Sequence, residues 1–245
     1  MLEVAAMTRL IEQIDRKLYR SFEDNWDDAL FRQRILSVVA GRSVEMLDVG
    51  AGAGIVKQMN FRGIANHICG VDPDHRVVDN PFLDEGKVGM GNAIPYADES
   101  FDIVFADNVL EHLVSPIEVF SEVLRVLRPG GVFLTKTPNA WHYMPLIARL
   151  TPHAFHRWFN RLRGRQAEDT FPTQYRANTP IALRRWAGET GFAVNRICLY
   201  EGRPEYLRFS VFTYLCGAIY ERLVNRFDLL ARFRILLIAE LRKPI

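Results

Sequence analysis

The sequence predicts an α/β protein in which a mostly parallel sheet carries helices on both faces. Short apolar runs of strand length alternate with amphipathic runs of helix length from residue 44 onward. Breaks rich in glycine and proline separate these runs, and such alternation is typical of parallel sheets covered by helices. A chain of 245 residues, 49% hydrophobic and 24% charged, fits one large domain of this kind.

The expected elements follow from periodicity and from helix start and stop signals. Two helices are expected within residues 1–40, with a turn at residues 24–28 between them. Strands are expected at residues 44–49, 67–72, 101–106, 132–136, 192–200 and 234–241. A helix is expected to start at residues 55–60, and further helices to occupy residues 117–127, 181–190 and much of 205–232. Residues 140–178 show few clean periods and are predicted to form a substrate-facing insertion.

Charge is distributed unevenly along the chain. Residues 1–140 contain 14 Lys/Arg and 21 Asp/Glu, whereas residues 141–245 contain 17 and 8. A basic second half could attract an anionic substrate, a nucleic acid or an acidic membrane surface, and a merely solvated Arg-rich face explains it equally well. The uncharged run at residues 209–220 is too short to span a membrane. The 205–232 segment is therefore predicted to be buried or interfacial, with peripheral membrane contact as one alternative.

The cysteines indicate a reducing compartment. Cys69, Cys198 and Cys216 lie far apart and form no CxxC pair, so the sequence suggests neither a zinc knuckle nor a disulfide framework. Charges interrupt residues 1–20, which lack the apolar core of a signal peptide. A cytoplasmic location is therefore expected. The six histidines form no spaced ligand set with carboxylates, and no catalytic metal is predicted.

A glycine loop follows the first expected strand. Gly50, Gly52 and Gly54 allow a tight turn and a close approach to a ligand, and Asp72 ends the next strand, where a carboxylate can accept from ribose hydroxyls. The dinucleotide fingerprint G-x-G-x-x-G would require glycine at the position of Ile55. Asp48, just before the loop, disfavours a pyrophosphate and suits a cationic ammonium or sulfonium ligand. The alternative is a purely structural glycine turn.

Four sequence blocks together carry a resemblance to a known family. They are residues 46–54, residues 71–74, residues 91–104, and the pair 109–113 and 122–131. In this order and spacing the chain resembles class I S-adenosylmethionine-dependent methyltransferases, in the branch of quinone-biosynthesis and small-molecule enzymes. The resemblance implies a Rossmann-like three-layer α/β/α sandwich with a seven-stranded, mostly parallel sheet whose last strand is antiparallel. It implies S-adenosyl-L-methionine as cofactor.

The resemblance also implies one domain over residues 1–245. Residues 1–40 would form a helical lid, residues 44–140 the cofactor-binding core, residues 140–178 an acceptor-side insertion and residues 205–232 a helical insertion before the last strand. Within the core, the methionine portion would be held by Asp48, Gly50, Ala51, Gly52 and Gly54.

The remaining cofactor contacts are implied in the same way. Asp72 with Pro73 would bind the ribose, and Asn92 with Ala93 would line the adenine site. Asp107 and Asn108 would lie near the sulfonium and the methionine amine. Asn92 departs from the aspartate usual in the family, yet its amide can accept from and donate to an adenine edge.

The acceptor side is less specified. His112 and His142 follow the fourth and fifth expected strands and are candidate general bases, with structural roles as the alternative. Arg176 beside Tyr175 could hold an anionic acceptor group or could anchor a loop. Trp26 is a candidate substrate contact or an ordinary core aromatic.

The predicted function is methyl transfer by direct displacement to a small-molecule acceptor. The expected acceptor is a hydroxyl of a sugar-, quinone-, polyketide- or lipid-like compound, and no oligomeric state is predicted. A nucleic-acid methyltransferase is disfavoured because residues 107–110 read Asp-Asn-Val-Leu where base-modifying enzymes carry Asn/Asp-Pro-Pro-Tyr/Phe. A non-catalytic binding or scaffold protein that kept the fold is the other alternative.

Overall fold

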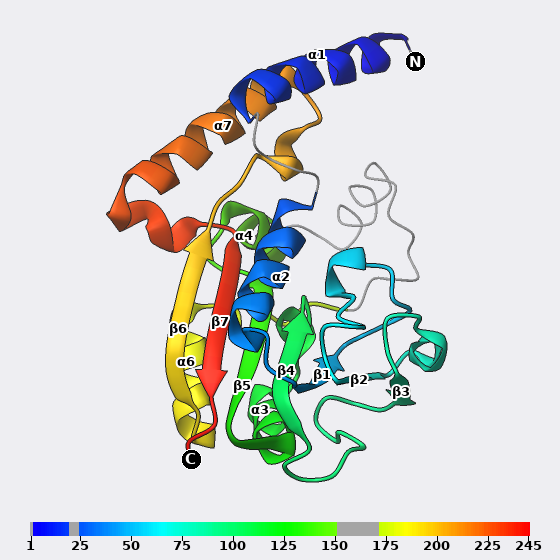
Figure 1. Cartoon of the computed structure of the whole chain (residues 1–245). Coiled ribbons are helices and arrows are strands. Elements are labelled where there is room, and N and C mark those ends of the chain that lie inside the picture. The colour runs from blue at the N-terminus through cyan, green and yellow to red at the C-terminus, as the bar shows by residue number, and fades with distance from the viewer. Residues whose placement is uncertain (1, 20–24, 151–171) are drawn as a thin grey trace.

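The computed structural model describes residues 2–19, 25–150 and 172–245. Seven strands form one sheet in the order β3-β2-β1-β4-β5-β7-β6 (Figure 1). All neighbouring pairs are parallel except the two that involve β7, which runs antiparallel to both β5 and β6. The predicted fold class is therefore confirmed, including the antiparallel last strand.

The elements have the following bounds. The strands are β1 Glu45–Val49, β2 His67–Asp72, β3 Glu85–Val88, β4 Phe101–Asp107, β5 Leu127–Pro138, β6 Ala193–Tyr200 and β7 Leu236–Arg242. The α-helices are α1 Leu2–Leu18, α2 Trp26–Val39, α3 Pro116–Val126, α4 Tyr143–Leu150, α6 Pro180–Thr190 and α7 Val211–Arg226. Short 3₁₀ helices are η1 Lys57–Met59, η2 His75–Asp79, η3 Leu110–His112, η5 Glu205–Leu207 and η6 Asp228–Phe233.

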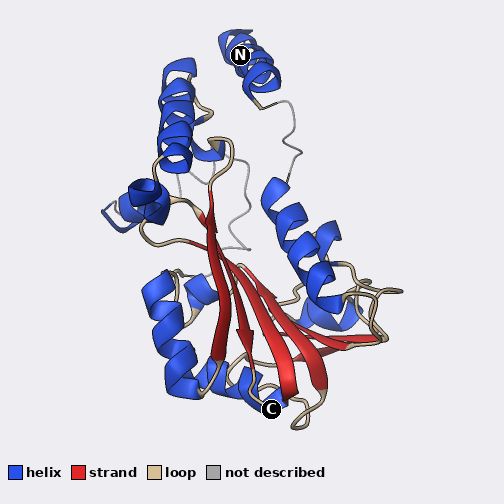
Figure 2. Ribbon diagram, turned by 60° about the vertical axis from the view of Figure 1, so that its left-hand side comes forward, coloured by secondary structure: helices blue, strands red, loops and turns tan. Residues whose placement is uncertain are grey.

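Two apolar clusters, one on each face of the sheet, make the three layers. On one face α3 and α6 bury Phe120, Val123, Leu183 and Ala187 against the strands. On the other face α2 and the segment between β1 and β2 do the same (Figure 2). Because both faces are covered, central strands such as β2 and β4 are buried along almost their whole length and carry mostly apolar residues. The packing on both faces therefore fixes the positions of the strand ends.

A third, smaller cluster joins α1 to α7 beyond the carboxyl ends of the parallel strands (Figure 1). Its centre is Asp15 of α1, which is buried. The hydroxyl of Tyr214 donates to Asp15, and Arg208 donates to it at 2.7 Å. Ile11 packs into the same contact. The amino-terminal helix is thus held by α7 rather than by the sheet.

The prediction of a helix beginning at residues 55–60 is wrong. Only the single 3₁₀ turn η1 forms there, and Ile55 is exposed. Arg32 of α2 donates to the carbonyls of Gln58 and Asn60 at 2.6 and 2.7 Å. A helix would need such carbonyls for its own backbone bonds, and β-branched residues with a glycine at 63 favour it little. The tertiary contact therefore replaces the helix.

Other elements were not predicted or were predicted only approximately. Strand β3 at the sheet edge was missed, and α4 lies in the stretch that showed no period. The expected helical stretch at 205–232 is η5, α7 and η6 in succession. Residues 151–171 of the predicted acceptor-side insertion lie outside the described residues. Within the part of the chain that is described, no helix is long and apolar enough to cross a membrane.

Candidate active site

The glycine loop leaves the end of β1 and turns back over β2. Gly50, Gly52 and Gly54 have φ angles of 84°, 51° and 72°, which side chains other than glycine rarely adopt. The amide of Gly50 donates to the Val71 carbonyl at 2.8 Å. The side-chain amide of Asn80 donates to the carbonyls of Ala51 and Gly52 at 3.0 and 3.1 Å. Hydrogen bonds from the loop to β2 and from Asn80 to the loop therefore fix its backbone at the carboxyl ends of β1 and β2.

Asp72 connects this loop to the end of β2. One carboxylate oxygen accepts from the Gly52 amide at 2.9 Å, and the other accepts from the Asp74 amide at 2.7 Å. The side chain is buried, so two backbone donors fix its orientation. Pro73 follows and is exposed. The structure thus brings Asp72 and the glycine loop together, as a ligand spanning both would require.

Two further carboxylates lie at the ends of the adjoining strands. Asp48 is buried at the end of β1, and Asp107 ends β4, the neighbouring strand. Burial raises the pKa of Asp48 well above its usual value, and the charges of Asp107 and Asp72 raise it further. Burial also raises the pKa of Asp107 to about 6, although Lys136 opposes the shift. Neighbouring carboxylates in a poorly solvated site attract a cation.

Lys136 of β5 lies in this acidic group with none of its side chain exposed. Its Nζ lies 2.9 Å from Asp107 Oδ1 and 3.3 Å from Asp27 Oδ2, and it donates to Asp28. Burial alone would lower the pKa of Lys136, but the three carboxylates outweigh that effect and raise it above its usual value. One ammonium therefore faces three carboxylates, and α2 is tied to the carboxyl ends of β4 and β5.

The remaining predicted cofactor residues lie on exposed turns. Asn92 and Ala93 follow β3, and the Asn92 amide donates to Glu118 of α3 at 2.8 Å. A Cβ at the adjacent Gly91 would meet Val49 at the end of β1 at 3.5 Å, so this turn lies beside the β1 strand end. Asn108 adopts a φ of 54° directly after β4 and is exposed. Their contacts to a cofactor stay predictions.

On the acceptor side, Glu111 holds the chain that returns before α6. Its carboxylate accepts from the Thr137 hydroxyl at 2.9 Å, and its carbonyl accepts from the amides of Gln174 and Tyr175 at 2.6 and 3.1 Å. Asn178 donates to the same Thr137 hydroxyl at 2.6 Å. Burial raises the pKa of Glu111. This network fixes residues 172–178 against the ends of β4 and β5.

His142 is buried among aromatic rings beneath α7. Its Nδ1 accepts from the Met144 amide at 3.2 Å, and its Nε2 lies 3.6 Å from Glu201 Oε2. The rings of Tyr143 and Tyr220 lie 4.0 and 5.5 Å from the imidazole, centroid to centroid. Burial lowers the pKa of His142 to about 3 and raises the pKa of Glu201 to about 8. Both groups are therefore neutral at pH 7, and both ring nitrogens face protein atoms.

The other predicted acceptor-side residues are less enclosed. His112 ends η3, and its Nδ1 lies 3.2 Å from the Pro172 carbonyl. Arg176 donates to the Val114 carbonyl at 2.6 Å, the loop-anchoring contact that was its alternative role. Tyr175 has a φ of 52°. Trp26 lies against Gly202, where a Cβ would come within 2.4 Å of the indole.

One group of possible metal ligands lies elsewhere. Among the described residues, the ligand atoms of His67, Cys69 and Glu85 lie within 4.8 Å of one another. These residues belong to the β2–β3 edge, and His67 begins the strand that Asp72 ends. The group is therefore remote from the acidic strand ends, and Glu85 is already paired with Lys87 at 3.1 Å.

The site fits S-adenosylmethionine on its own chemistry. A Cβ at Gly52 would meet no protein atom within 4 Å, so the loop borders open space at this point. Asp48 and Asp107 would offer carboxyl oxygens to an ammonium or sulfonium group, and Asp72 would offer acceptors to hydroxyls. The carboxyl ends of strands on either side of the point where strand order reverses form the usual ligand crevice of such sheets.

Comparisons with known proteins agree with this geometry. Residues 47–135 match the family model for a methyltransferase domain. An uncharacterised methyltransferase of Mycobacterium tuberculosis is 32% identical over 177 residues, which cover 68% of this chain and 69% of that protein. A Mycolicibacterium smegmatis protein named "Probable S-adenosylmethionine-dependent methyltransferase" is 37% identical over 129 residues, 51% of this chain and 48% of that protein. The solved structure of the YcgJ protein from Bacillus subtilis has a TM-score of 0.56 at 17% identity, covers 89% of this chain and 99% of its own, and shares the fold.

The strand order, with an antiparallel β7, is that of the class I methyltransferase fold. The chain belongs to the family of S-adenosylmethionine-dependent methyltransferases. It spans slightly less than two thirds of the length of two further relatives that it matches, 64% of one and 63% of the other.

The structure adds residues that sequence reasoning missed. Asn80 supports the glycine loop, and Lys136 with Asp27 and Asp28 surrounds Asp107. A lysine at the end of a predicted strand, shortly after the apolar run at residues 132–134, was a usable signal for Lys136, because an unpaired buried ammonium is costly. Asn80 carried no comparable signal.

Proposed function

We propose that this protein transfers a methyl group from S-adenosylmethionine to a small-molecule acceptor by direct displacement. The observation that carries the proposal is the set of three carboxylates, Asp48, Asp72 and Asp107, at the ends of neighbouring strands beside an open glycine loop. When bound, the cofactor supplies an electrophilic methyl group on sulfur. The protein's contribution is orientation and electrostatics.

The residues divide this work by position. Asp72 offers acceptors to ribose hydroxyls, and the Gly50–Gly54 backbone lets the methionine portion approach closely. Asp107 and Asp48 attract the cationic groups. The acceptor approaches from the carboxyl-end side, which residues 172–178 border through their bonds to Glu111.

We propose a hydroxyl on a sugar-, quinone-, polyketide- or lipid-like molecule as the acceptor. The support is the basic and aromatic composition of the second half of the chain. A hydroxyl acceptor must lose a proton, for which His112 and His142 remain our candidates. Of the two, His112 is the less enclosed, whereas His142 would have to turn away from Glu201 or Met144 to reach an acceptor.

Substitution separates catalysis from structure at these two histidines. If His142 acts as a base, His142→Gln lowers kcat and leaves the Kd for S-adenosylhomocysteine unchanged. If it only packs among the tyrosines, the substitution lowers the melting temperature, kcat falls and the Kd for S-adenosylhomocysteine rises. The same pair of measurements on His112→Gln gives the comparison, with kcat normalised to folded protein.

Calorimetry with S-adenosylmethionine and S-adenosylhomocysteine tests the proposal directly. Turnover is then measured as S-adenosylhomocysteine release in the presence of hydroxylated sugars, phenols and lipid-like alcohols. Absence of binding at millimolar cofactor would exclude the proposed methyltransferase activity. Binding without turnover of any acceptor class would favour the non-catalytic alternative.

A further inference from the structure

Helix α7 carries an apolar face that is exposed along its whole length. Phe212 and Ile219 are 77% and 59% exposed. Residues three or four positions apart share one face of a helix. The face is formed by Phe212, Leu215, Ile219, Leu223 and Phe227, all of them exposed, and we call it the α7 stripe. Leu229, in the turn that follows, extends it with 76% exposure.

This stripe is not the face by which α7 joins the protein. The opposite side of the helix buries Tyr214, Ala218 and Val224. A Cβ at Gly217 would lie 2.5 Å from Pro204, so the backbone packs closely there. The helix therefore already has a core contact, and the stripe is additional apolar surface. Contiguous surfaces of this kind mark interaction sites in folded proteins.

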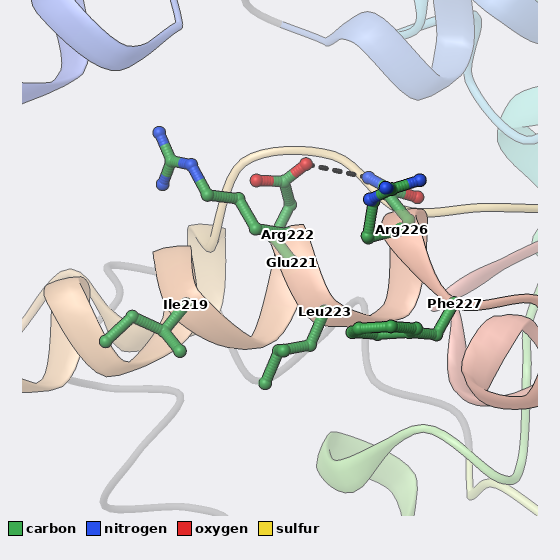
Figure 3. A pocket seen from close by; sticks show the side chains of 7 residues that line it. Ile219, Glu221, Arg222, Leu223, Arg226 and Phe227 are labelled. Atoms are coloured by element: carbon green, nitrogen blue, oxygen red, sulfur yellow. Dashed lines mark hydrogen bonds between the residues drawn. The ribbon is translucent and has the colours of Figure 1, made fainter.

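Cations border the stripe. In Figure 3, Ile219, Leu223 and Phe227 project from one side of α7, while Arg222 and Arg226 leave the other side. Both arginines are exposed, and a surface hollow of about 560 Å³ lies among these residues. Glu221 leaves the helix on the same side as the two arginines, where its carboxylate accepts from the side-chain amide of Asn225 at 2.7 Å and from the hydroxyl of Tyr19, just after α1, at 3.1 Å. The exposed surface therefore combines the apolar stripe with two exposed arginines, and its acidic groups are the hydrogen-bonded Glu221 and the exposed Asp228 that follows Phe227.

We propose that the α7 stripe lies in the surface of an anionic lipid bilayer. The aromatic and aliphatic side chains would enter the boundary between headgroups and acyl chains, and the long arginine side chains would reach the phosphates. A helix of 16 residues is too short to cross a bilayer but suits a position in its plane. The two exposed arginines favour this occupant over a second copy, because a twofold contact would place the same arginine-bearing surface against itself.

The position of α7 gives the binding a consequence for catalysis. The helix lies beyond the carboxyl ends of the parallel strands, on the side where an acceptor would enter (Figure 1). This consequence rests on the proposed methyl transfer: membrane binding through the α7 stripe selects an amphipathic acceptor carried by the bilayer. The binding itself needs neither cofactor nor turnover.

Vesicle co-sedimentation tests the proposal on the full-length protein. We expect binding to phosphatidylglycerol/phosphatidylcholine vesicles and weaker binding to phosphatidylcholine alone or at high salt. The double variant Phe212→Ser/Ile219→Ser should lose binding at least about tenfold. The double variant Arg222→Gln/Arg226→Gln should lose the preference for anionic vesicles. Ile181→Ser and Arg184→Gln, at exposed positions of α6, are matched controls that should bind as wild type does.

Other outcomes would overturn it. They are absence of vesicle binding by the wild type, equal losses in the α6 controls, or a wild-type dimer that the Phe212/Ile219 variant dissociates. Calorimetry with S-adenosylhomocysteine on each variant reports folding and the cofactor site independently. A variant that loses vesicle binding but keeps its cofactor affinity therefore assigns the loss to the α7 stripe. A wild-type protein that binds vesicles but not the cofactor would contradict the proposed function alone.

Discussion

The Nζ of Lys136 lies 2.9 Å from Asp107 Oδ1, in a position where no part of the lysine side chain reaches solvent. Asp107 ends β4, and Lys136 is its register partner on β5. The ammonium opposes the effect of burial on the carboxyl, and Asp27 and Asp28 complete the group from α2. The pair therefore connects the candidate cofactor site to the amino-terminal part of the chain.

Replacement of Lys136 should destabilise the protein strongly. We expect Lys136→Met to lower the free energy of unfolding by about 3–5 kcal/mol, the usual effect of removing one partner from a buried ion pair. Without the ammonium the pKa of Asp107 rises further, so the folded variant binds this proton more tightly than the unfolded chain does. Its stability should then fall as pH rises from about 5 to 8.

Urea unfolding at both pH values checks this, with the partly exposed Lys87→Met as control. A Lys136→Met variant as stable as wild type at pH 8 would show that the carboxylates do not depend on the ammonium.

Cofactor affinity should depend on the charge of Asp107. Its pKa of about 6 lies above its usual value, so the carboxyl is charged at pH 7.5 and protonated at pH 5. We expect the Kd for S-adenosylmethionine to rise by up to about tenfold over this range. At one pH unit below the pKa, only about a tenth of the Asp107 carboxyl groups carry a charge. Asp107→Asn should flatten the profile in calorimetry. An unchanged profile in that variant would assign the titration to Asp48 instead.

The raised pKa of Asp107 also affects stability. The effect has the opposite sign to that of an aspartate whose pKa is lowered in the folded protein. Because the folded pKa is raised, the folded protein holds this proton more tightly than the unfolded chain does. The stabilising contribution of protonated Asp107 is present below its unfolded pKa and is lost as pH rises to about 6. Chemical unfolding of Asp107→Asn against wild type between pH 4 and 7 measures it.

Gly52 should be required for the cofactor rather than for the fold. Gly52 and Gly63 both have positive φ, 51° and 76°, and a Cβ on either meets nothing within 4 Å. Alanine at each position should therefore cost a similar ~1 kcal/mol of stability. Only Gly52→Ala should also raise the Kd for S-adenosylhomocysteine, by tenfold or more, roughly 1.4 kcal/mol or above. Equal affinities in the two variants would mean that the loop does not border the ligand.

Asp72 should contribute to cofactor affinity through its carboxylate. We expect Asp72→Ala to raise the Kd for S-adenosylmethionine about tenfold, the scale of one or two lost charge-assisted hydrogen bonds. The exposed Asp79→Ala, on the neighbouring η2, is the matched control and should bind as wild type does. Wild-type affinity in Asp72→Ala would refute the assignment to the ribose.

The candidate cofactor site could be predicted largely from the sequence because its elements are local. The glycines follow one strand directly and Asp72 ends the next one, so spacing alone places them together at the carboxyl ends of neighbouring strands. The helix expected at residues 55–60 failed for the opposite reason. Its carbonyls are bound by Arg32 from another helix, a contact that no local pattern contains.

The surroundings of Asp107 and the acceptor side depend on contacts between distant parts of the chain. Asp27 reaches Lys136 across 109 positions, and His142 meets Glu201 only because β6 ends beside the segment that follows β5. The position of His142 after the fifth expected strand indicated a possible base, whereas the structure shows both nitrogens of His142 facing protein atoms.

The sequence by itself determined the fold class, the positions of six of the seven described strands and, through the resemblance of its motifs to a known family, the cofactor class, because strand runs, glycine placement and strand-end carboxylates lie in short segments. Tertiary structure decided the charge state of Asp107, the neutral pair of His142 and Glu201, and which side of α7 is exposed. Each of these depends on burial and on partners from other elements, and neither is encoded in local periodicity.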